Sequence, residues 1–255
     1  MTSRSERKIW RSLRRRKGRD ATGWFIAEGP RLLEELLVAR TRVHAILYEK
    51  GCGGGEPLGG LLERASRSDL RIEDVERKVI EEVADTKTPQ TVVTVADIPR
   101  WTWEDVPRGS VVLLDGVQDP GNVGTLARTG VGLGAVAVIA METTADPWGP
   151  KAVRAAAGAG LRRPVFRADR ASTVAELERR ELPLWVAAAD GDRLGRCTDV
   201  GRGVALALGS EVHGVSAPLE RAAARRVAIA MKGETESLNV AVAGAILLDR
   251  MMGEG

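Results

Sequence analysis

Three stretches in the C-terminal half of the chain combine hydrogen-bonding side chains with glycines. They are residues 115–129, 207–214 and 229–243. Their candidate catalytic side chains are Asn122, Arg128, Glu211, Ser237 and Asn239. A carboxylate can accept hydrogen bonds or oppose a cation, and glycines let a ligand approach the backbone closely. These residue types therefore suit the binding and orientation of a ligand.

Each stretch taken alone also has an ordinary structural explanation. Asn122 and Ser237 stand where helices are predicted to begin, so both fit helix N-caps. Arg128 fits a surface charge, and the Gly209–Gly214 segment fits a plain turn. His213 in that segment could serve in acid–base chemistry, although a lone loop histidine is more often incidental. Only the three stretches together therefore indicate a function.

The elements that must position these residues form an alternating pattern. Short, nearly continuous apolar runs predict strands at 111–114, 136–140, 184–188, 204–208 and 227–230, and helical stretches fall between most of them. Strands that are apolar without alternation are buried on both faces, which indicates a mostly parallel sheet covered by helices. Each polar stretch directly follows a predicted strand, where open α/β sheets place their ligands.

The first twenty residues are strongly basic, although the net charge of the whole chain is only +3. Residues 4–17 are predicted to form one helix with an apolar stripe of Ile9, Trp10 and Leu13. The candidate RNA-binding residues in it are Arg11, Arg14, Arg15, Arg16 and Lys17. A cluster of this kind gains affinity by releasing the counterions of phosphates. The alternative is a solvated helix that binds nothing.

The rest of the N-terminal part alternates between helices and strands. Helices are predicted at 30–39, 58–65 and 76–84, and strands at 43–48 and 91–95. Residues 96–109 contain prolines and tryptophans and follow neither period. We therefore predict an N-terminal domain at 1–98, a linker at 99–109 and a C-terminal α/β domain at 110–255.

Composition narrows the classes of protein further. Cys52 and Cys197 lie far apart without histidines at ligand spacing, so neither a disulfide framework nor a metal site is expected. The chain has no signal-like apolar segment and no apolar run of the roughly 18 residues that a membrane span needs. We therefore expect a cytoplasmic protein that does not associate with membranes.

The three stretches, in this order over the last 145 or so residues, resemble the SpoU/TrmH family of RNA 2′-O-ribose methyltransferases in the SPOUT superfamily. The N-terminal part is similar to the substrate-binding domain of many members. That likeness rests on the basic helix and on Phe25-Ile-Ala-Glu-Gly-Pro-Arg31, and it adds Arg31 to the candidate RNA-binding residues.

The resemblance implies an α/β fold with a trefoil knot, a homodimer with active sites formed across it, and S-adenosylmethionine as cofactor. The cofactor-binding positions carried over are Ala188, Gly209, Ile229, Met231 and Leu238. The implied reaction is methylation of a ribose 2′-hydroxyl, with 23S ribosomal RNA favoured and transfer RNA as the alternative substrate. Arg128 would hold the target's phosphate and orient the hydroxyl, and its role as a base stays open.

Two other classes of function are weighed against this one. Gly130, Gly132 and Gly134 satisfy the loose dinucleotide pattern of a nicotinamide-dependent oxidoreductase. That fingerprint should follow a strand and open a helix, whereas these glycines end a predicted helix and precede a strand. The second alternative is a non-catalytic RNA-binding protein with the SPOUT fold, which predicts the loss of motif residues that this chain retains.

Overall fold

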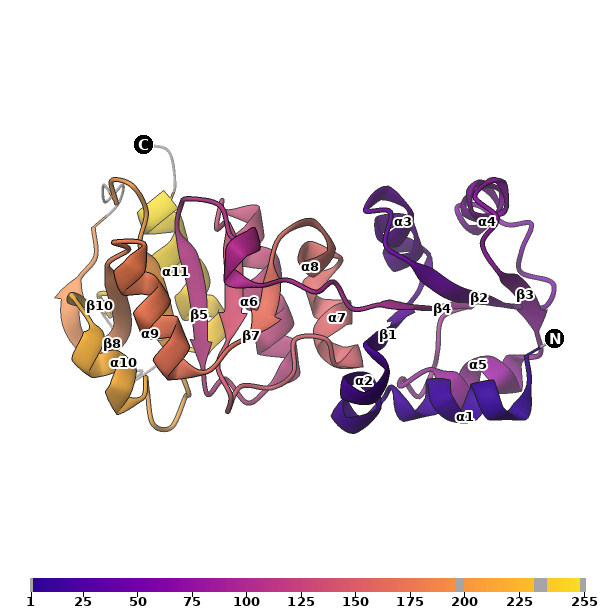
Figure 1. Ribbon diagram of the computed structural model, residues 1–255, viewed down its shortest axis with the longest axis horizontal. Coiled ribbons are helices and arrows are strands. Elements are labelled where there is room, and N and C mark those ends of the chain that lie inside the picture. The colour runs from indigo at the N-terminus through magenta and orange to yellow at the C-terminus, as the bar shows by residue number, and fades with distance from the viewer. Residues whose placement is uncertain (1, 196–199, 232–237, 253–255) are drawn as a thin grey trace. The chain divides into compact units, whose positions relative to one another are not determined.

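The structure, a computed structural model, describes residues 2–195, 200–231 and 238–252. The chain forms two compact units (Figure 1). The first comprises Met1–Pro99 and Trp148–Leu161, and the second comprises Arg100–Pro147 and Arg162–Gly255. The segment Trp148–Leu161, which the sequence places in the C-terminal domain, thus packs with the first unit. The expected domain boundaries at 98 and 110 stay a prediction.

The first unit contains a four-stranded mixed sheet in the order β1-β4-β2-β3. Its strands are β1 (Trp24–Glu28), β2 (Val43–Glu49), β3 (Ile72–Val75) and β4 (Val92–Asp97). β4 runs antiparallel to both β1 and β2, while β2 and β3 are parallel. β1 and β3 are not among the predicted strands. Both are short edge strands, so their local patterns carry little periodic signal.

Helices cover both faces of this sheet. They are α1 (Arg4–Ser12), α2 (Arg16–Thr22), α3 (Pro30–Val38), α4 (Leu58–Arg67) and α5 (Arg77–Val83). Buried side chains of α1 and α5, including Trp10 and Ile80, pack on one face, and those of α3 and α4, including Leu33 and Leu61, pack on the other (Figure 1).

The prediction of a single helix over 4–17 is wrong, because the chain turns between α1 and α2. Gly18, just beyond the predicted helix, lies inside α2. A Cβ at Gly18 would lie 2.2 Å from the carbonyl oxygen of Ser12, so the turn requires a glycine at this close approach. Leu13 and Trp10 are buried as expected, whereas Ile9 is exposed.

The second unit is built on a six-stranded sheet in the order β10-β8-β9-β5-β6-β7, in which every pairing is parallel. Its strands are β5 (Val111–Asp115), β6 (Ala137–Ala140), β7 (Val165–Arg167), β8 (Leu184–Arg193), β9 (Ala205–Gly209) and β10 (Arg225–Ala228). The prediction of a mostly parallel sheet is confirmed. The three-residue β7 was not predicted, because it is too short to show a pattern.

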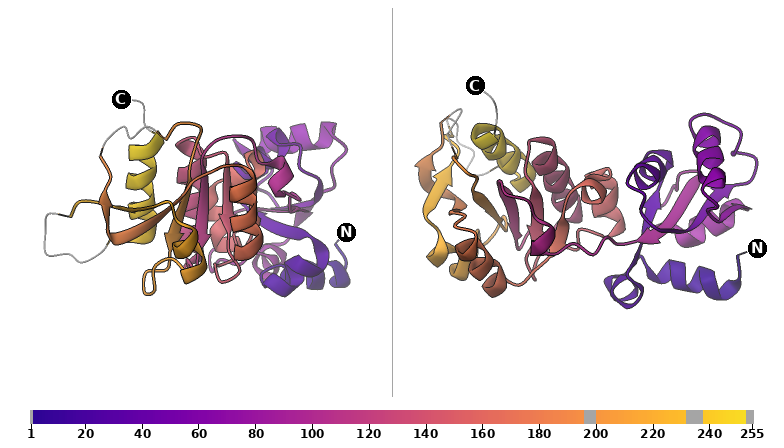
Figure 2. Two further views of the ribbon diagram at one scale, coloured as in Figure 1. Left: turned by 60° about the vertical axis from the view of Figure 1, so that its left-hand side comes forward. Right: turned by 45° about the horizontal axis from the view of Figure 1, so that its top comes forward.

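The remaining helices are α6 (Pro120–Gly132), α7 (Pro150–Ala156), α8 (Ala159–Arg162), α9 (Arg170–Arg179), α10 (Ala217–Ala222) and α11 (Val240–Met252), and η1 (Trp103–Asp105) is a 3₁₀ turn. In the second unit α6 and α11 lie on one side of the sheet, while α9 and α10 lie on the other (Figure 2). No helix among the described residues is long and apolar enough to cross a membrane.

Helix α11 is partly buried within its own chain. A Cβ at Gly244 would lie 2.4 Å from Leu126 of α6 and 2.7 Å from Leu208 of β9, so this glycine allows the close packing of helix on helix and sheet. The helix is not buried on every face. Val242 on another face of the helix is 49% exposed.

The strand order places the candidate residues at one edge of the sheet. The chain passes from β5 outward to β6 and β7, then returns on the other side of β5 through β8 and β9. The order therefore reverses between β5 and β9, which are neighbours. In open α/β sheets ligands bind at the carboxyl ends of strands beside such a switch point. The loops after β5 and β9 meet there.

Candidate active site

Asn122 lies in the first turn of α6, after the loop that follows β5, and its side-chain amide is not used to cap the helix. Asp119 is the N-cap of α6, and its Oδ1 accepts a hydrogen bond from the Asn122 backbone N–H at 3.0 Å. Pro120 occupies the first turn, where a missing N–H costs nothing. The interpretation of Asn122 as an N-cap is therefore wrong. With Asp119 in that role, the Asn122 amide can make other contacts.

Side chains from all three polar stretches meet at this amide. Asn122 Nδ2 donates a hydrogen bond to Glu211 Oε1 at 3.1 Å. Asn239 Nδ2 donates to Asn122 Oδ1 at 3.2 Å and to Glu211 Oε1 at 3.4 Å. These residues lie 89 and 117 positions from Asn122 along the chain. The structure thus brings together three of the five predicted catalytic residues.

Asn239 is held in place by the helix that follows it. Its Oδ1 accepts the backbone N–H of Ala241 at 2.9 Å and that of Val242 at 3.3 Å. Asn239 therefore caps the beginning of α11, the role expected of Ser237. Ser237 itself lies outside the described residues. Because capping occupies only Oδ1 of Asn239, its Nδ2 remains directed at Asn122 and Glu211.

Glu211 sits in a tight loop that only glycine allows. A Cβ at Gly209 would lie 2.0 Å from the carbonyl carbon of Gly214, a distance no side chain tolerates. Ser210 and Gly214 exchange backbone hydrogen bonds of 3.0 and 2.9 Å, and Gly214 has a positive φ of 66°. The loop is therefore closed on itself and presents Glu211 at the sheet edge.

Two cavities flank this loop. The Asn122 cavity, about 470 Å³, is lined on one side by the segment after β5 and on the other by residues 210–214. The Leu238 cavity, about 250 Å³, is lined by all five predicted cofactor-binding residues: Ala188, Gly209, Ile229, Met231 and Leu238. Both cavities are lined by Ser210, Glu211, Gly214 and Val240. A ligand in one would therefore face a ligand in the other across Glu211.

The lining of the Leu238 cavity is mostly apolar. It combines aliphatic side chains such as Val227 and Leu247 with backbone from the middle of β8 and from the segments at the ends of β9 and β10. Loop backbone outside regular pairing can offer N–H and C=O groups to a bound molecule. The cavity therefore suits a ligand with an extended apolar surface and a few polar atoms.

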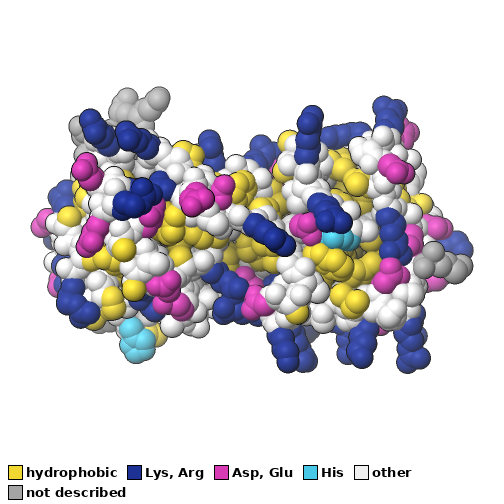
Figure 3. All heavy atoms as spheres, viewed as in Figure 1, with side chains coloured by type: hydrophobic (Ala, Val, Ile, Leu, Met, Phe, Trp, Pro, Cys, Tyr) yellow, Lys and Arg dark blue, Asp and Glu magenta, His cyan; other side chains and the backbone are white. Residues whose placement is uncertain are grey.

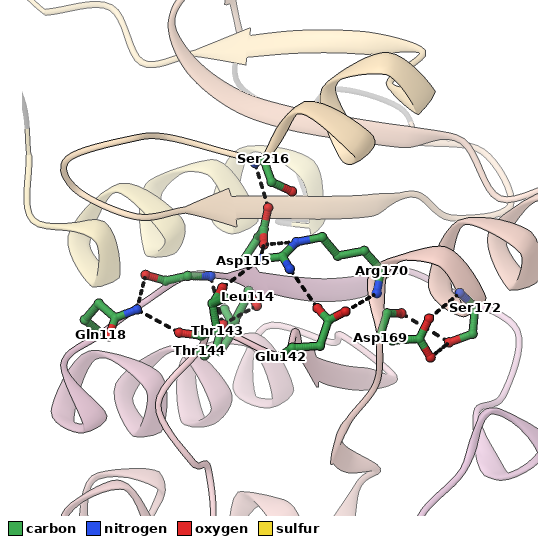
Figure 4. Close-up of polar contacts among 11 residues, drawn as sticks. Leu114, Asp115, Gln118, Glu142, Thr143, Thr144, Asp169, Arg170, Ser172 and Ser216 are labelled. Atoms are coloured by element: carbon green, nitrogen blue, oxygen red, sulfur yellow. Dashed lines mark hydrogen bonds and ion pairs between the residues drawn. The ribbon is translucent and has the colours of Figure 1, made fainter.

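The Asn122 cavity also contains residues that the sequence analysis did not select. Asp115, the last residue of β5, is almost fully buried, and Arg170, the first residue of α9, lines the cavity. Arg170 bonds to Asp115, Glu142 and Thr143 (Figure 4). The position of Asp115 at a strand end, inside the first polar stretch, was a usable signal. The sequence around Arg170 offered none.

Arg128 does not join the cluster in one chain. It is exposed on α6 and lines neither cavity as the structure describes them. Six residues along a helix correspond to about 120° of rotation around its axis, so Arg128 and Asn122 point in different directions. The role of Arg128 that the resemblance implies stays a prediction.

The predicted RNA-binding residues fall into two groups. Arg14 is used structurally, because its guanidinium donates to the backbone carbonyls of Glu81, Glu82 and Val83 at the end of α5. Arg16 forms a surface pair with Asp20 at 3.4 Å. The side chains of Arg11, Arg15, Lys17 and Arg31 are exposed. Figure 3 shows Lys and Arg side chains projecting where Figure 1 places α1 and α2.

The dinucleotide-like glycines serve a different purpose. Gly130 and Gly132 lie in the last turn of α6, and Gly134 precedes β6 with a φ of 100°. They end a helix instead of opening one. This confirms that the context is wrong for a dinucleotide fingerprint.

Comparison with protein families matches both parts of the chain. Residues 109–249 match the model described as the SpoU rRNA Methylase family. Residues 6–94 match the model of the MRM3-like substrate binding domain. The first match contains all five predicted catalytic residues and all five predicted cofactor-binding residues.

Individual relatives are similar along nearly the whole length. The chain is 32% identical over 246 residues to the 23S rRNA (guanosine(2553)-2′-O)-methyltransferase RlmP of Bacillus subtilis (strain 168), covering 96% of this chain and 95% of that protein. A solved AdoMet-bound rRNA methyltransferase from Sinorhizobium meliloti has a TM-score of 0.83 and 28% identity, covering 98% and 95% of the two chains. The SpoU methyltransferase AviRb from Streptomyces viridochromogenes, solved with AdoMet, has a TM-score of 0.87 and 25% identity, covering 97% of each chain.

Proposed function

Because the chain belongs to the SpoU family of rRNA methylases, we propose that it transfers the methyl group of S-adenosylmethionine to a ribose 2′-hydroxyl of 23S ribosomal RNA. It is an RNA 2′-O-ribose methyltransferase with a SPOUT fold, a mostly parallel sheet and a smaller N-terminal α/β domain. The observation that carries the proposal is the shared wall of the Asn122 and Leu238 cavities, formed in part by Glu211.

The Leu238 cavity is the proposed site of the cofactor. S-adenosylmethionine supplies a methyl group on a positively charged sulfur. The apolar lining fits its adenosine, and because Gly209 approaches Gly214 so closely, a side chain at 209 would disrupt this wall. Glu211 on the shared wall places a carboxylate near the cationic donor, which favours its binding.

The Asn122 cavity is the proposed site of the target ribose. Asn122, Glu211 and Asn239 offer amide and carboxylate groups that can hold hydroxyls. Methyl transfer requires the attacking oxygen, the methyl carbon and the sulfur to lie in line. Holding two reactants in such an arrangement can lower the barrier by roughly 7–11 kcal/mol. Orientation across the shared wall is therefore the main task of these side chains.

We further propose that the enzyme is a homodimer and that Arg128 acts in the active site of the partner subunit. Two observations support this arrangement. Arg128 is exposed and points away from Asn122 on the same helix, and α11, which packs on α6, leaves Val242 exposed. Arginine stays protonated at neutral pH, so its role is to hold the target phosphate and orient the hydroxyl.

Mixed dimers test the shared site directly. Asn122→Ala and Arg128→Ala are each expected to be nearly inactive when alone. Mixing them after reversible dissociation should restore about a quarter of wild-type activity, because half of the dimers are mixed and each has one complete site. If Arg128 acts within its own chain, the mixture stays inactive. A monomer by analytical ultracentrifugation would exclude the arrangement altogether.

The choice of RNA is tested with the purified protein. Radiolabelled S-adenosylmethionine is supplied with 23S rRNA, 16S rRNA or transfer RNA, and the modified ribose is mapped by its resistance to alkaline cleavage. We expect one modified position in 23S rRNA. Labelling of transfer RNA would support the alternative substrate, and RNA binding without transfer would support a non-catalytic protein. Since ribosomal RNA is the proposed substrate, we place the protein in the cytoplasm.

A further inference from the structure

We propose that Asp115 and Arg170 are positioning residues of this reaction, whose buried ion pair holds the Asn122 loop against the Glu211 loop. The proposal rests on the methyltransferase function above and extends it to residues that need not touch either reactant. It follows from a hydrogen-bond network that ties together the loops after β5, β6, β7 and β9 (Figure 4).

Asp115 is the centre of the network. It is 2% exposed, and both of its carboxylate oxygens are bonded. Oδ1 accepts Arg170 Nε at 2.8 Å and lies 2.6 Å from Arg170 Nη2, while Oδ2 accepts the Ser216 backbone N–H at 2.7 Å. Gly214 ends the Glu211 loop, and Ser216 lies two residues after it. One carboxylate therefore links the end of β5 to the segment that carries Glu211.

Arg170 reaches Asp115 from the beginning of α9. Its Nη1 donates to Glu142 Oε2 at 2.8 Å, its Nη2 donates to Thr143 Oγ1 at 2.7 Å, and its backbone N–H bonds to Glu142 Oε1 at 3.1 Å. Every guanidinium nitrogen thus has an acceptor within the protein. The Arg170 guanidinium therefore holds the loops together, and it has few N–H donors left to bind a substrate phosphate.

The same segment is fastened on its other side. The Gly116 N–H donates to Thr144 Oγ1 at 2.9 Å, Thr144 Oγ1 donates to the Leu114 carbonyl at 2.6 Å, and Gln118 Nε2 donates to the Thr143 carbonyl at 2.7 Å. Asp119, the cap of α6, comes next. The position of Asn122 therefore depends on a segment whose ends are fixed by Asp115 and Asp119.

The loops brought together by the pair are in close proximity. A methyl group at Gly116 would lie 3.5 Å from the Ser210 side chain, and 3.6 Å from Thr143 Oγ1. Without the pair, the Asn122 loop and the Glu211 loop lose their common anchor. The Leu238 cavity keeps most of its lining, because Ala188, Ile229 and Leu238 lie outside the network. Catalysis should therefore suffer more than cofactor binding.

The test compares Asp115→Asn and Thr143→Val with wild type. The first substitution keeps the shape of the side chain and one acceptor but removes the charge, and the second removes one acceptor of Arg170 without exposing a charge. We expect kcat to fall by about 10²-fold in Asp115→Asn, since a misplacement of about 1 Å can cost this much, and by a smaller factor in Thr143→Val. The Kd for S-adenosylmethionine should change less than about threefold, which is under about 1 kcal/mol of binding free energy, because most of the Leu238 cavity lies outside the network.

Glu176→Gln is the matched control. Glu176 holds Arg179 and Arg180 at 2.6 Å each and does not line the Asn122 cavity. Glu176→Gln should lower the unfolding temperature and leave kcat unchanged. All kinetic assays are made at temperatures at which circular dichroism shows that each variant is fully folded. The positioning role is wrong if Asp115→Asn, like the control, loses stability but keeps its kcat. It is also wrong if Asp115→Asn and Thr143→Val both keep the kcat of wild type. A wild-type protein that methylates no RNA would instead overturn the proposed function.

Discussion

The two units put their arginines to different uses. In the first unit several guanidiniums bond within the protein: Arg7 pairs with Glu82 at 3.1 Å, Arg71 pairs with Glu6 at 2.5 Å, and buried Arg19 bonds to the Leu13 carbonyl. In the second unit Arg170 bonds to Asp115 in the lining of the Asn122 cavity, while Arg128 is exposed on α6. The number of basic residues in a sequence is therefore a poor guide to how many of them contact nucleic acid.

The comparison also separates two kinds of glycine. Gly18 of the first unit permits a turn between helices, whereas Gly209 of the second lines the Leu238 cavity beside the Glu211 loop. The first serves packing alone, and the second serves packing and a ligand together. A substitution at Gly18 should consequently lower stability, whereas one at Gly209 should lower the affinity for the cofactor.

The largest expected effect comes from removing the Asn122 amide, which we propose to orient the ribose. Asn122→Ala should lower methyl transfer by roughly 10²–10³-fold, as the loss of one preorganised hydrogen-bonding group does elsewhere. Asp119 still caps α6, so the helix should form and S-adenosylmethionine should still bind. Single-turnover kinetics with saturating RNA measure the effect. A rate close to that of wild type would remove Asn122 from the active site.

A second effect concerns the wall of the Leu238 cavity. Gly209→Ala places a Cβ against the Gly214 backbone, and forcing such contacts typically costs about 1–3 kcal/mol. The loop should open and weaken cofactor binding by roughly 10–100-fold, as measured by isothermal titration calorimetry. Gly132→Ala is the control, since nothing lies within 4 Å of its Cβ position. Equal affinities in both variants would contradict the assignment of this cavity.

The third prediction divides the basic residues of the first unit. Replacing Arg11, Arg15 and Lys17 with alanine should raise the KM for RNA and make the salt dependence of binding shallower by roughly 0.7–0.9 for each phosphate that is no longer neutralised. Arg14→Ala should instead lower stability with little change in that slope, because its donors are used by α5. Filter binding over a range of salt separates the two groups. Identical slopes would mean that these side chains do not bind RNA.

The smallest effect tests the ion pairs that hold the first unit. The Arg71 guanidinium and the Ser3 backbone N–H lower the pKa of Glu6 from 4.5 to about 2. A lowered folded-state pKa stabilises the protein above pH 4.5, and this contribution is lost as the pH falls toward 2. Glu6→Gln should reduce the unfolding temperature slightly at neutral pH, since a surface pair contributes about 1 kcal/mol or less. The difference from wild type should shrink at about pH 3, and a constant difference would exclude the pair as its source.

The sequence by itself determined the α/β class of the second unit and the strand ends beside which its candidate site residues stand. Unbroken apolar runs such as 111–114 can only be buried on both faces, which predicted the parallel sheet that the structure contains. Because parallel strands end at a common edge, Asn122, Glu211 and Asn239 could be assigned to one site before any fold was known. The resemblance of these stretches to SpoU/TrmH enzymes supplied the reaction and the cofactor.

Only the tertiary structure decided how the site is supported. Arg170 stands 55 residues after Asp115, at the start of an ordinary amphipathic helix, and no periodicity relates the two. The structure also gave the capping roles to Asp119 and Asn239, and showed that Arg14 points inward while Arg128 points away from Asn122. Local sequence encodes burial and period, whereas the partner of a charged side chain depends on which loops the sheet order brings together.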